Sequence, residues 1–342
     1  MADMVTVLNT ILANASPEYQ TRVPEATRTN IGEVGSAIME FQVTENEFLN
    51  ALVNKIAMTI VRNKTYKNPL AILKKGGVPL GRNIEEIYTN PAKGTVFDPS
   101  GANLLNRSIP DTKAIYHSMN RQGQYKATVS KSQLIQAFTS YEALEKLLNS
   151  IVNSIYSGDN LDEFILMKNL FASAITGGKI KTVNTELAAI TDTDGAKKFV
   201  KAVKTVGQAM EFPSTQFNSY YDINSENDAT PVITWTPLEN QVLILRNDVA
   251  VDVDVELLAK AFNVSYTDLN QRTLIVDNFG ATEEAAKCGA ILCDEAYVQV
   301  YDNLTQMESF HNGEGLYDNF IYHHWQTYSL SLFANATAFM FT

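Results

Sequence analysis

Apolar positions recur at helical spacing most regularly in the middle of the chain. In YEALEKLLNSIVNSIY, which starts at Tyr141, aliphatic residues fall on one side of a helix, and the stripe resumes after Gly158 as far as Ile175. Asp159 could cap a second helix at this break, or one helix could continue with a kink. The pattern therefore predicts a long helix or a helix pair that ends at Gly177-Gly178.

Shorter patterns precede this region. Residues 1–42 hold prolines and glycines among short apolar groups, which predicts an arm of short helical pieces. Thr44 and Glu47 have capping-box spacing. They predict the start of a helix that ends near Met58 and passes into a strand at 59–62.

The region from 179 to 290 mixes helical and strand patterns, which indicates an α/β unit. Asp194 precedes a helix with apolar residues on one face and lysines on the other. Residues 241–245 and 274–276 are predicted strands. Valines alternate with Ala and Asp over 249–255, which predicts a half-exposed strand.

Two further patterns concern turns and loops. The segment 212–237 is polar, aromatic and flanked by proline, so it is predicted to be a loop. Near the C-terminal end, β-like runs at 296–301 and 304–310 flank Asp302-Asn303, which predicts a hairpin turn.

Residues 63–130 break this regularity. Glycine and proline recur throughout, and only short β-like runs such as 114–116 and 124–129 remain. A structureless loop of this length is unusual inside a compact domain, so we interpret the segment as a long two-stranded excursion. Such an excursion cannot bury its own surface, and it therefore needs a partner surface.

Composition narrows the function classes. The chain has 342 residues, 45% of them hydrophobic, and a formal net charge of -11. A dedicated nucleic-acid binder would show a basic face, although an acidic protein could still enclose nucleic acid without gripping it. We expect no signal peptide, and no apolar run reaches the ~18 residues of a membrane span. Cys288 and Cys293 predict two reduced thiols on or near a strand.

The stretch KKGGVPLGRN is the nearest approach to a cofactor motif. Gly76 and Gly81 have the spacing of a phosphate-binding loop. Arg82 and Asn83 replace the lysine and the hydroxyl residue of that motif, and Pro79 removes a backbone N–H. Nucleotide binding is therefore not expected.

No arrangement of residues predicts catalysis or metal binding. Of the four histidines, His323 and His324 are adjacent, and on a predicted strand their side chains would point to opposite faces. The motifs of a nucleophile elbow and of a zinc protease are missing from the sequence. We expect no catalytic residue, no metal site and no cofactor, and we interpret the histidines as structural.

Charged residues indicate contacts between subunits instead. Basic residues cluster in the excursion and could meet an acidic patch on a neighbouring subunit. The acidic pairs Glu85-Glu86 and Asp252 with Asp254 could in principle act as acid/base pairs. We interpret them as charges that solvate a face or meet lysines on a neighbour.

Several collinear segments resemble one protein family, the major capsid (head) proteins of small tailed bacteriophages of the phi-29 type. The resemblance covers nearly the whole chain and depends on the order and spacing of the segments together. These segments are VPLGRNIEEIYTN (78–90), MNRQGQYKATV (119–129), DVDVELLAKAFN (252–263), VYDNLTQME (300–308) and GLYDNFIYHHWQTYSLSLFANATAF (315–339).

The resemblance implies an α+β fold of the Hong Kong 97 (HK-97-like) capsid type. Its parts map to 1–43 for the N-terminal arm, 63–130 for the extended loop, 178–289 for the axial domain, and 44–62, 131–177 and 290–342 for the peripheral domain, of which 131–177 holds the spine helix. The phi-29 protein has an extra C-terminal immunoglobulin-like domain, which we do not expect here because the sequence stops at Thr342.

The resemblance also implies a function. The protein would self-assemble into pentamers and hexamers and form an icosahedral or prolate head around double-stranded DNA, with little specific DNA contact and no membrane. Implied partners are further copies of the chain, a scaffolding protein and a portal or connector. Its place would be the virion, and the host cytoplasm before assembly. The intersubunit contacts expected in the loop are Lys74, Lys75, Gly76, Gly77, Gly81, Arg82, Glu85 and Glu86, with Asp252 and Asp254 as possible partners.

Two alternatives stay open at this point. The same fold could build an encapsulin-like compartment that loads protein cargo. The chain could also be a cytosolic enzyme of unrecognised chemistry, which would remain a small oligomer.

Overall fold

The chain forms two compact units, each built from several stretches of sequence. The computed structural model describes residues 4–59, 66–79, 81, 83–97, 99–100, 105–138, 141–224, 230–253 and 273–342. The first unit comprises Met1–Asn68, Arg121–Glu163 and Asp302–Gln326. The second unit comprises Pro69–Asn120, Phe164–Tyr301 and Thr327–Thr342.

Short helices open the first unit, as the sequence predicted. Ser16 caps the second of them, because its hydroxyl accepts the N–H of Tyr19 and Pro17 occupies the first helical position. Ser130 and Gln133 form a capping box at the start of the last one. The helices are α1 (Met4–Asn14), α2 (Pro17–Arg22), α3 (Ile31–Glu40), α4 (Gln42–Thr59) and α5 (Lys131–Ala137).

The predicted helix start at Thr44 was wrong. Helix α4 begins at Gln42, and the Thr44 hydroxyl donates to the carbonyls of Ile38 and Phe41 instead of capping. The Glu47 carboxylate accepts the Ser16 hydroxyl at 2.8 Å, so it serves the cap of α2. The contact of Glu47 with Ser16, which lies outside α4, thus takes the place of the expected capping box between Thr44 and Glu47. The predicted strand also fails at Thr59, which ends α4, and its other residues lie outside the described part.

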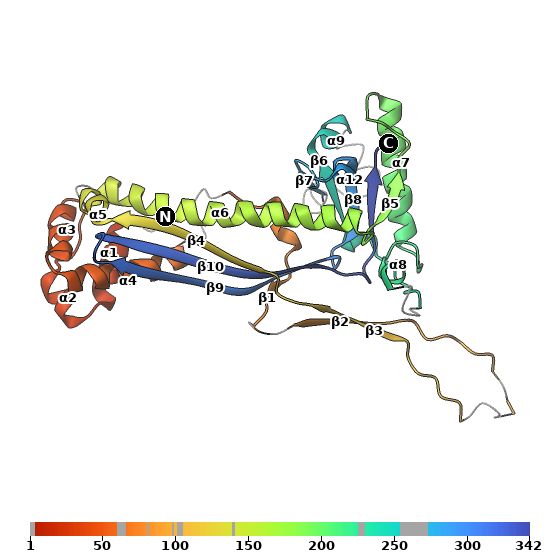
Figure 1. Ribbon diagram of the computed structural model, residues 1–342, viewed down its shortest axis with the longest axis horizontal. Helices are drawn as coiled ribbons and strands as arrows, with labels where there is room; N and C mark the ends of the chain where they lie inside the picture. Colours follow the sequence, from red (N-terminus) through yellow and green to blue (C-terminus); the bar gives the residue numbers. More distant parts are fainter. Residues whose placement is uncertain are drawn as a thin grey trace. The chain divides into compact units, whose positions relative to one another are not determined.

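The long central helix is continuous. Helix α6 runs from Tyr141 to Thr176 over 36 residues and passes through Gly158 without a break (Figure 1). It ends as predicted, with Gly178 at φ 64° and the Lys179 N–H bonded to the Ala174 carbonyl. Within the described part of the chain, no helix combines the length and the apolar character needed to cross a membrane.

One sheet has the order β1-β9-β10-β4. In the first unit β10 pairs antiparallel with β4, with Tyr322 opposite Tyr125. Phe320 and Tyr322 of β10 join the buried core that Ile151 and Ile155 of α6 also enter. The strands are β1 (Gly76–Gly77), β4 (Arg121–Ser130), β9 (Val298–Asn312) and β10 (Tyr317–Leu330).

The predicted hairpin turn at Asp302-Asn303 was wrong, because β9 runs straight through it. The Asp302 carboxylate is held by His324 and Gln326 of β10, which gives a residue normally favoured in turns a reason to lie inside a strand. The turn between β9 and β10 lies after Asn312 and includes Leu316 at φ 50°.

The second unit contains a five-stranded sheet with the order β5-β11-β8-β6-β7. Strand β11 is parallel to β5 and antiparallel to β8, while β6 is antiparallel to β8 and parallel to β7. The predicted strands at 241–245 and 274–276 are therefore present. The strands are β5 (Lys181–Asn184), β6 (Gln241–Arg246), β7 (Thr273–Val276), β8 (Cys288–Asp294) and β11 (Ala336–Met340).

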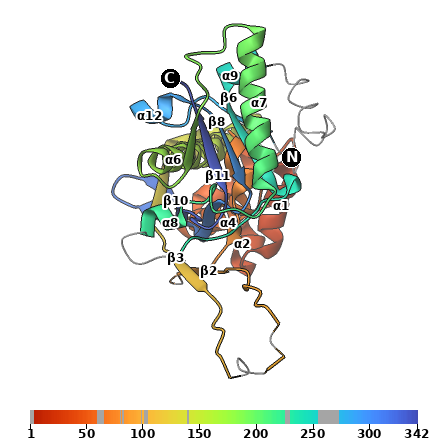
Figure 2. The same ribbon diagram turned by 90° about the vertical axis from the view of Figure 1, so that its right-hand side faces the viewer.

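Both faces of this sheet are covered. Helix α7 (Thr193–Met210) lies on one face, where Phe199 shares a core with Leu243 and Leu245 (Figure 2). Ile244 points to the other face and joins the core of Phe171 from the end of α6. Burial on both sides explains why β8 is apolar as far as its last residue, Asp294, and Cys288 and Cys293 lie in it as free, buried thiols, as predicted.

Helix α7 begins two residues earlier than the sequence indicated, with Asp192 and not Asp194 as its cap. The predicted strand over 249–255 was wrong where it is described. Residues Asn247–Asp252 form the helix α9, with Val249 and Val253 buried on one side and Val251 84% exposed. Helical packing has overridden the strand preference of valine.

Several short elements complete the second unit. Helix α8 lies inside the segment that was predicted as a loop, and Thr282 caps α12 through a bond from the N–H of Ala285. These elements are η2 (Pro69–Leu73), α8 (Tyr220–Asn224), η4 (Leu238–Asn240) and α12 (Glu283–Ala286).

Candidate functional site

An antiparallel hairpin projects from the second unit, which confirms the predicted two-stranded excursion for 84–117 but not for its full extent of 63–130, because Arg121–Ser130 pairs with β10 instead. Strands β2 (Ile84–Thr89) and β3 (Thr112–His117) pair with Glu85 opposite Tyr116 and Thr89 opposite Thr112 (Figure 1). Side chains alternate between the two faces of the hairpin, so one face can bind the body of the unit while the other stays free.

The inner face of the hairpin is fixed to the second unit. The Tyr88 ring stacks on Phe333 with ring centroids 5.5 Å apart, and its hydroxyl donates to the Ile233 carbonyl at 2.6 Å. The Glu86 carboxylate accepts the Ser331 hydroxyl and lies 3.1 Å from Nε2 of the buried His117. These contacts position the hairpin before any partner is present.

A polar cluster anchors the end of the hairpin where the loop begins. The Asn90 amide donates to the Asp111 carboxylate and the Pro231 carbonyl, while Lys113 donates to Asp111 and Thr230. The hydrogen bond from Lys113, with that from Asn90, lowers the pKa of Asp111 to about 2. Asp111 is therefore charged at any physiological pH, and the anchor persists.

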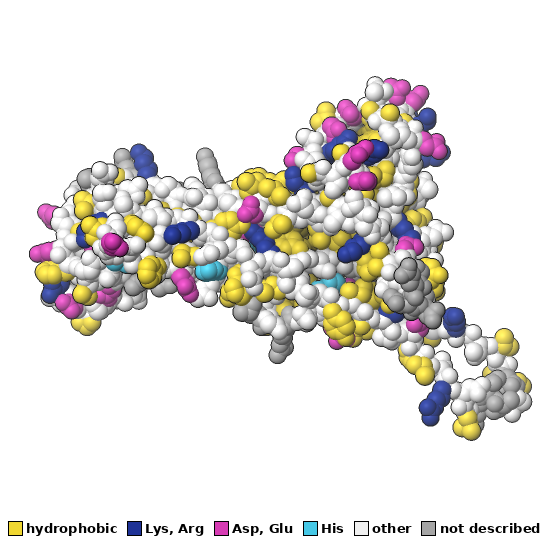
Figure 3. Space-filling model, in the orientation of Figure 1, with side chains coloured by type: hydrophobic (Ala, Val, Ile, Leu, Met, Phe, Trp, Pro, Cys, Tyr) yellow, Lys and Arg dark blue, Asp and Glu magenta, His cyan; other side chains and the backbone are white. Residues whose placement is uncertain are grey.

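The loop beyond this anchor exposes large apolar side chains. Val96 is 94% exposed and Phe97 is 85% exposed on one arm. Leu105 is 92% exposed and Ile109 is 83% exposed on the other. Figure 3 shows yellow hydrophobic side chains standing on the outer surface of this loop. Apolar residues gathered on a projecting segment mark an interaction surface.

The contact residues predicted from sequence fall into separate groups. Gly76 and Gly77 form β1 beside β9, where the Lys75 N–H bonds to the Val300 carbonyl and Lys75 Nζ donates to the Glu295 carbonyl at 2.8 Å. Lys74 lies next to this edge, and its N–H bonds to the Ala71 carbonyl. Gly81 has φ 81°, which glycine adopts without strain.

The acidic residues that were predicted as contacts also lie in different places. Glu85 lies on the outer face of the hairpin and accepts the Tyr116 hydroxyl, whereas Glu86 faces inward. Asp252 is exposed at the end of α9, and among the described residues no ion pair joins it to Lys75. Arg82 and Asp254 lie outside the described residues.

Sequence reasoning missed the apolar loop and the Tyr88 anchor. The alternation of Ile84, Glu86 and Tyr88 was an available sign of an inward face. Val96-Phe97 between Gly94 and Pro99 was an available sign of an exposed apolar group.

A second cluster of interest is buried in the first unit. The imidazole of His324 lies between two carboxylates, with Nδ1 2.6 Å from Asp159 and Nε2 2.9 Å from Asp302. Arg121 pairs with Asp159 at 3.0 Å, and Gln326 donates to both Asp302 and Glu163. Burial lowers the pKa of His324, but the hydrogen bonds to Asp159 and Asp302 outweigh it and raise the pKa to about 9.

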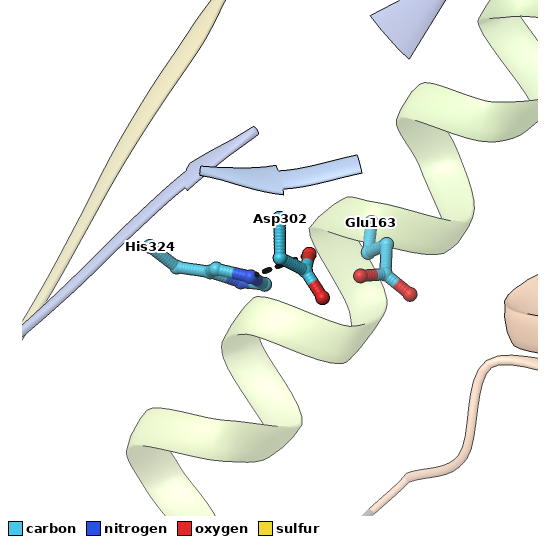
Figure 4. Close-up of side chains that lie close together, drawn as sticks. All are labelled: Glu163, Asp302 and His324. Carbon is cyan, nitrogen blue, oxygen red and sulfur yellow. Dashed lines mark hydrogen bonds and ion pairs between the residues drawn. The ribbon is translucent and has the colours of Figure 1, made fainter. Parts of the chain in front are cut away.

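Three ligand atoms of this cluster lie close enough to hold a metal ion. Glu163, Asp302 and His324 each offer an atom within 4.8 Å of the others (Figure 4). A histidine that binds a metal ion must be neutral, because the ring nitrogen that contacts the metal needs a free lone pair. Here both ring nitrogens face carboxylates, and the raised pKa keeps the ring charged. The imidazolium itself is the cation that these carboxylates surround, so we interpret the cluster as structural.

Comparisons with known proteins agree with one another. The sequence profile of the Phi29-like phage major capsid protein family matches residues 8–340. The major capsid protein of Bacillus phage PZA is 35% identical over 338 residues, which cover 98% of this chain and 72% of the relative. The major capsid protein of Streptococcus phage Cp-1 is 30% identical over 347 residues, with 97% and 92% covered.

Solved structures show the fold. The capsid structure of Staphylococcus phage Andhra matches with a TM-score of 0.66 at 13% identity, covering 82% of this chain and 86% of that chain. The mature capsid of bacteriophage PhiM1 matches with a TM-score of 0.53 at 9% identity, covering 82% and 89%. The predicted α+β fold of the HK-97-like capsid type is thereby confirmed.

Proposed function

We propose, from the premise that the chain belongs to the Phi29-like phage major capsid protein family, that its extended loop joins neighbouring copies in the phage head. As a major capsid protein, the chain forms the head shell and is a component of the virion. The alternative of a compartment for protein cargo is not supported, because the family and the similar curated proteins are phage major capsid proteins.

The exposed apolar loop is the observation that carries this proposal. Val96, Phe97, Leu105 and Ile109 are each more than four-fifths exposed, in a hairpin whose base is fixed to its own unit. Removing about 100 Å² of apolar surface from water contributes roughly 2.5 kcal/mol, which favours a partner that covers the loop. In a shell of identical chains, the available partner is another copy.

The finer features of the shell are also part of the proposal. Pentamers and hexamers in an icosahedral or prolate head would enclose double-stranded DNA, and a net charge of -11 would limit its adhesion to the wall. A scaffolding protein and a portal would guide assembly in the host cytoplasm. Residues 178–289 would line the capsomer centre, with β8 and β11 completing their sheet. The role is structural and not catalytic.

Shortening the loop tests the proposal. Residues 91–110 are replaced by Asn-Gly, which suits a two-residue hairpin turn between the paired Asn90 and Asp111. We expect a folded, soluble chain that forms no shells in electron micrographs. A matched variant keeps the loop length and changes Val96, Phe97, Leu105 and Ile109 to Ser, which separates apolar contact from reach. Normal shells from both variants would contradict the proposal.

A further inference from the structure

The first unit carries an apolar groove between α3 and α5. Its volume is about 370 Å³, at the lower end of the roughly 300–1,000 Å³ that is usual for binding pockets. That space suits one or two side chains and not a whole helix. The lining residues are Gly32, Gly35, Ser36, Met39, Ile135 and Phe138.

Glycine keeps this groove open. A Cβ at Gly32 would meet only the Phe138 carbonyl, at 3.9 Å, so the absence of a side chain there leaves room above the helix. A Cβ at Gly35 would lie 2.3 Å from Cβ of Phe138, so this glycine lets the ring pack directly on α3. Phe138 forms the floor and pairs with Phe48 at 5.4 Å.

We propose that this groove receives Val96 and Phe97 from the loop of a second copy of the chain, an inference that rests on the proposed function. The groove offers an apolar floor with an aromatic ring, and Phe97 is an aromatic side chain that its own chain leaves 85% exposed. Aromatic side chains that enter pockets dominate the free energy of many interfaces. A ring added beside Phe138 would gain an edge or stacking contact as well as burial.

The charges around the two surfaces are complementary. Helix α3 exposes Glu33 and Glu40 and holds no basic residue. The loop residues 91–110 hold Lys93 and Arg107 against one acid, Asp98. Opposite charges at the rim favour this pairing over contact between two like loops, and they fix the direction of approach.

The aromatic ring of Phe138 in the groove favours Phe97 over Leu105 and Ile109 on the other arm. Val96 and Phe97 are consecutive and both are exposed, so Phe97 can enter the groove while Val96 covers its rim. Ile135 is 51% exposed at the edge of the groove and would meet Val96 there. Leu105 and Ile109 remain for other contacts of the shell.

Mixed cysteine variants test the contact between copies. Chains carrying Phe97→Cys and chains carrying Ser36→Cys are combined, allowed to assemble, treated with a mild thiol oxidant and separated without reductant. Both native cysteines are fully buried, so they do not compete. We expect a covalent dimer from the mixture and at least about a tenfold smaller amount from either variant alone. A control pairs Phe97→Cys with Thr21→Cys, an exposed position on α2 that does not line the groove.

The outcomes separate the two proposals. Shells that give the dimer with Ser36→Cys and not with Thr21→Cys support the groove. Shells without that dimer, or with equal dimer at both positions, overturn the groove and leave the proposed function intact. If the unsubstituted chain never forms shells, the proposed function is wrong, and this inference fails with it.

A blocking variant gives an independent readout. Gly32→Leu fills the groove from a helical position with free space, so the melting temperature should not fall. We expect shell assembly to require about tenfold more protein, which corresponds to the loss of one apolar contact of ~1.4 kcal/mol. If the Gly32→Leu variant folds and assembles at the same protein concentration as the wild type, the proposal that the loop docks in this groove is wrong.

Discussion

Nδ1 of His324 lies 2.6 Å from a carboxylate oxygen of Asp159, which joins strand β10 to helix α6 inside the first unit. Nε2 of the same ring lies 2.9 Å from Asp302 on β9. One imidazolium therefore connects the consecutive strands β9 and β10 to helix α6, which is distant from them in sequence. Since removing one partner of a buried ion pair leaves the other charge uncompensated, this ring is a sensitive point of the fold.

The His324 cluster predicts a loss of stability in alkali. The pKa of His324 is about 9 in the folded chain, above the unfolded value of about 6.5. The stabilisation by the charged ring is therefore complete below about pH 6.5 and is lost as pH rises through 9. The shift corresponds to about 3 kcal/mol. Thermal melting of the wild type between about pH 6 and pH 10 should show this decline. His324→Gln should start lower and decline less, and parallel profiles would refute the assignment.

Removing Asp159 should be far more costly than removing Asp162 one turn away. Asp159→Ala removes one of the two carboxylates that hold the buried His324 ring and also the ion pair of Asp159 with Arg121, so we expect a loss of about 3–5 kcal/mol in the free energy of unfolding. Asp162 is exposed and accepts one hydrogen bond from Tyr125, so Asp162→Ala should cost less than about 1.5 kcal/mol. Urea denaturation compares them, and equal losses would argue against the cluster.

Two glycines of α3 should respond to alanine with opposite signs. Gly32→Ala places its methyl group in open space and favours the helix, so it should stabilise the chain by about 0.4–1 kcal/mol. Gly35→Ala forces Phe138 to move and should destabilise it by about 1–3 kcal/mol. Denaturant midpoints measure both, and a stable Gly35→Ala variant would show that Phe138 can shift freely.

Tyr88 should control how firmly the hairpin is held. Tyr88→Ala removes the stack on Phe333 and the bond to the Ile233 carbonyl, so the amides of β2 should exchange with solvent faster. Tyr88→Phe keeps the ring and should cost only about 1 kcal/mol of local stability. Hydrogen exchange followed by mass spectrometry reads out the two variants, and identical protection in wild type and Tyr88→Ala would contradict the anchor.

Elements with strong local patterns were predictable from the sequence. The apolar stripe of α6 and the apolar runs of β6 and β8 each carry enough information by themselves. The errors arose where distant residues decide the outcome. Asp302 lies inside a strand because His324 neutralises it, and α9 is a helix because Val249 and Val253 pack together on a core. Neither the contact of Asp302 with His324 nor the core on which α9 packs is evident from the neighbouring sequence.

The proposed contact surface was only partly predictable. Glycine and proline identified a projecting segment, but its charged residues were the expected contacts. Glu86 proves to face its own unit, while the apolar residues near Phe97 are exposed. Exposure depends on which face of the hairpin is anchored, and that is set by Phe333 and Ile233, far along the chain.

The most direct test of the central claim is a cryo-electron microscopy map of shells assembled from this chain. We predict that residues 91–110 lie against a neighbouring copy, with Val96 and Phe97 buried by it. A map in which these residues project into solvent, or contact only their own chain, would contradict the claim that the extended loop joins the copies of the shell.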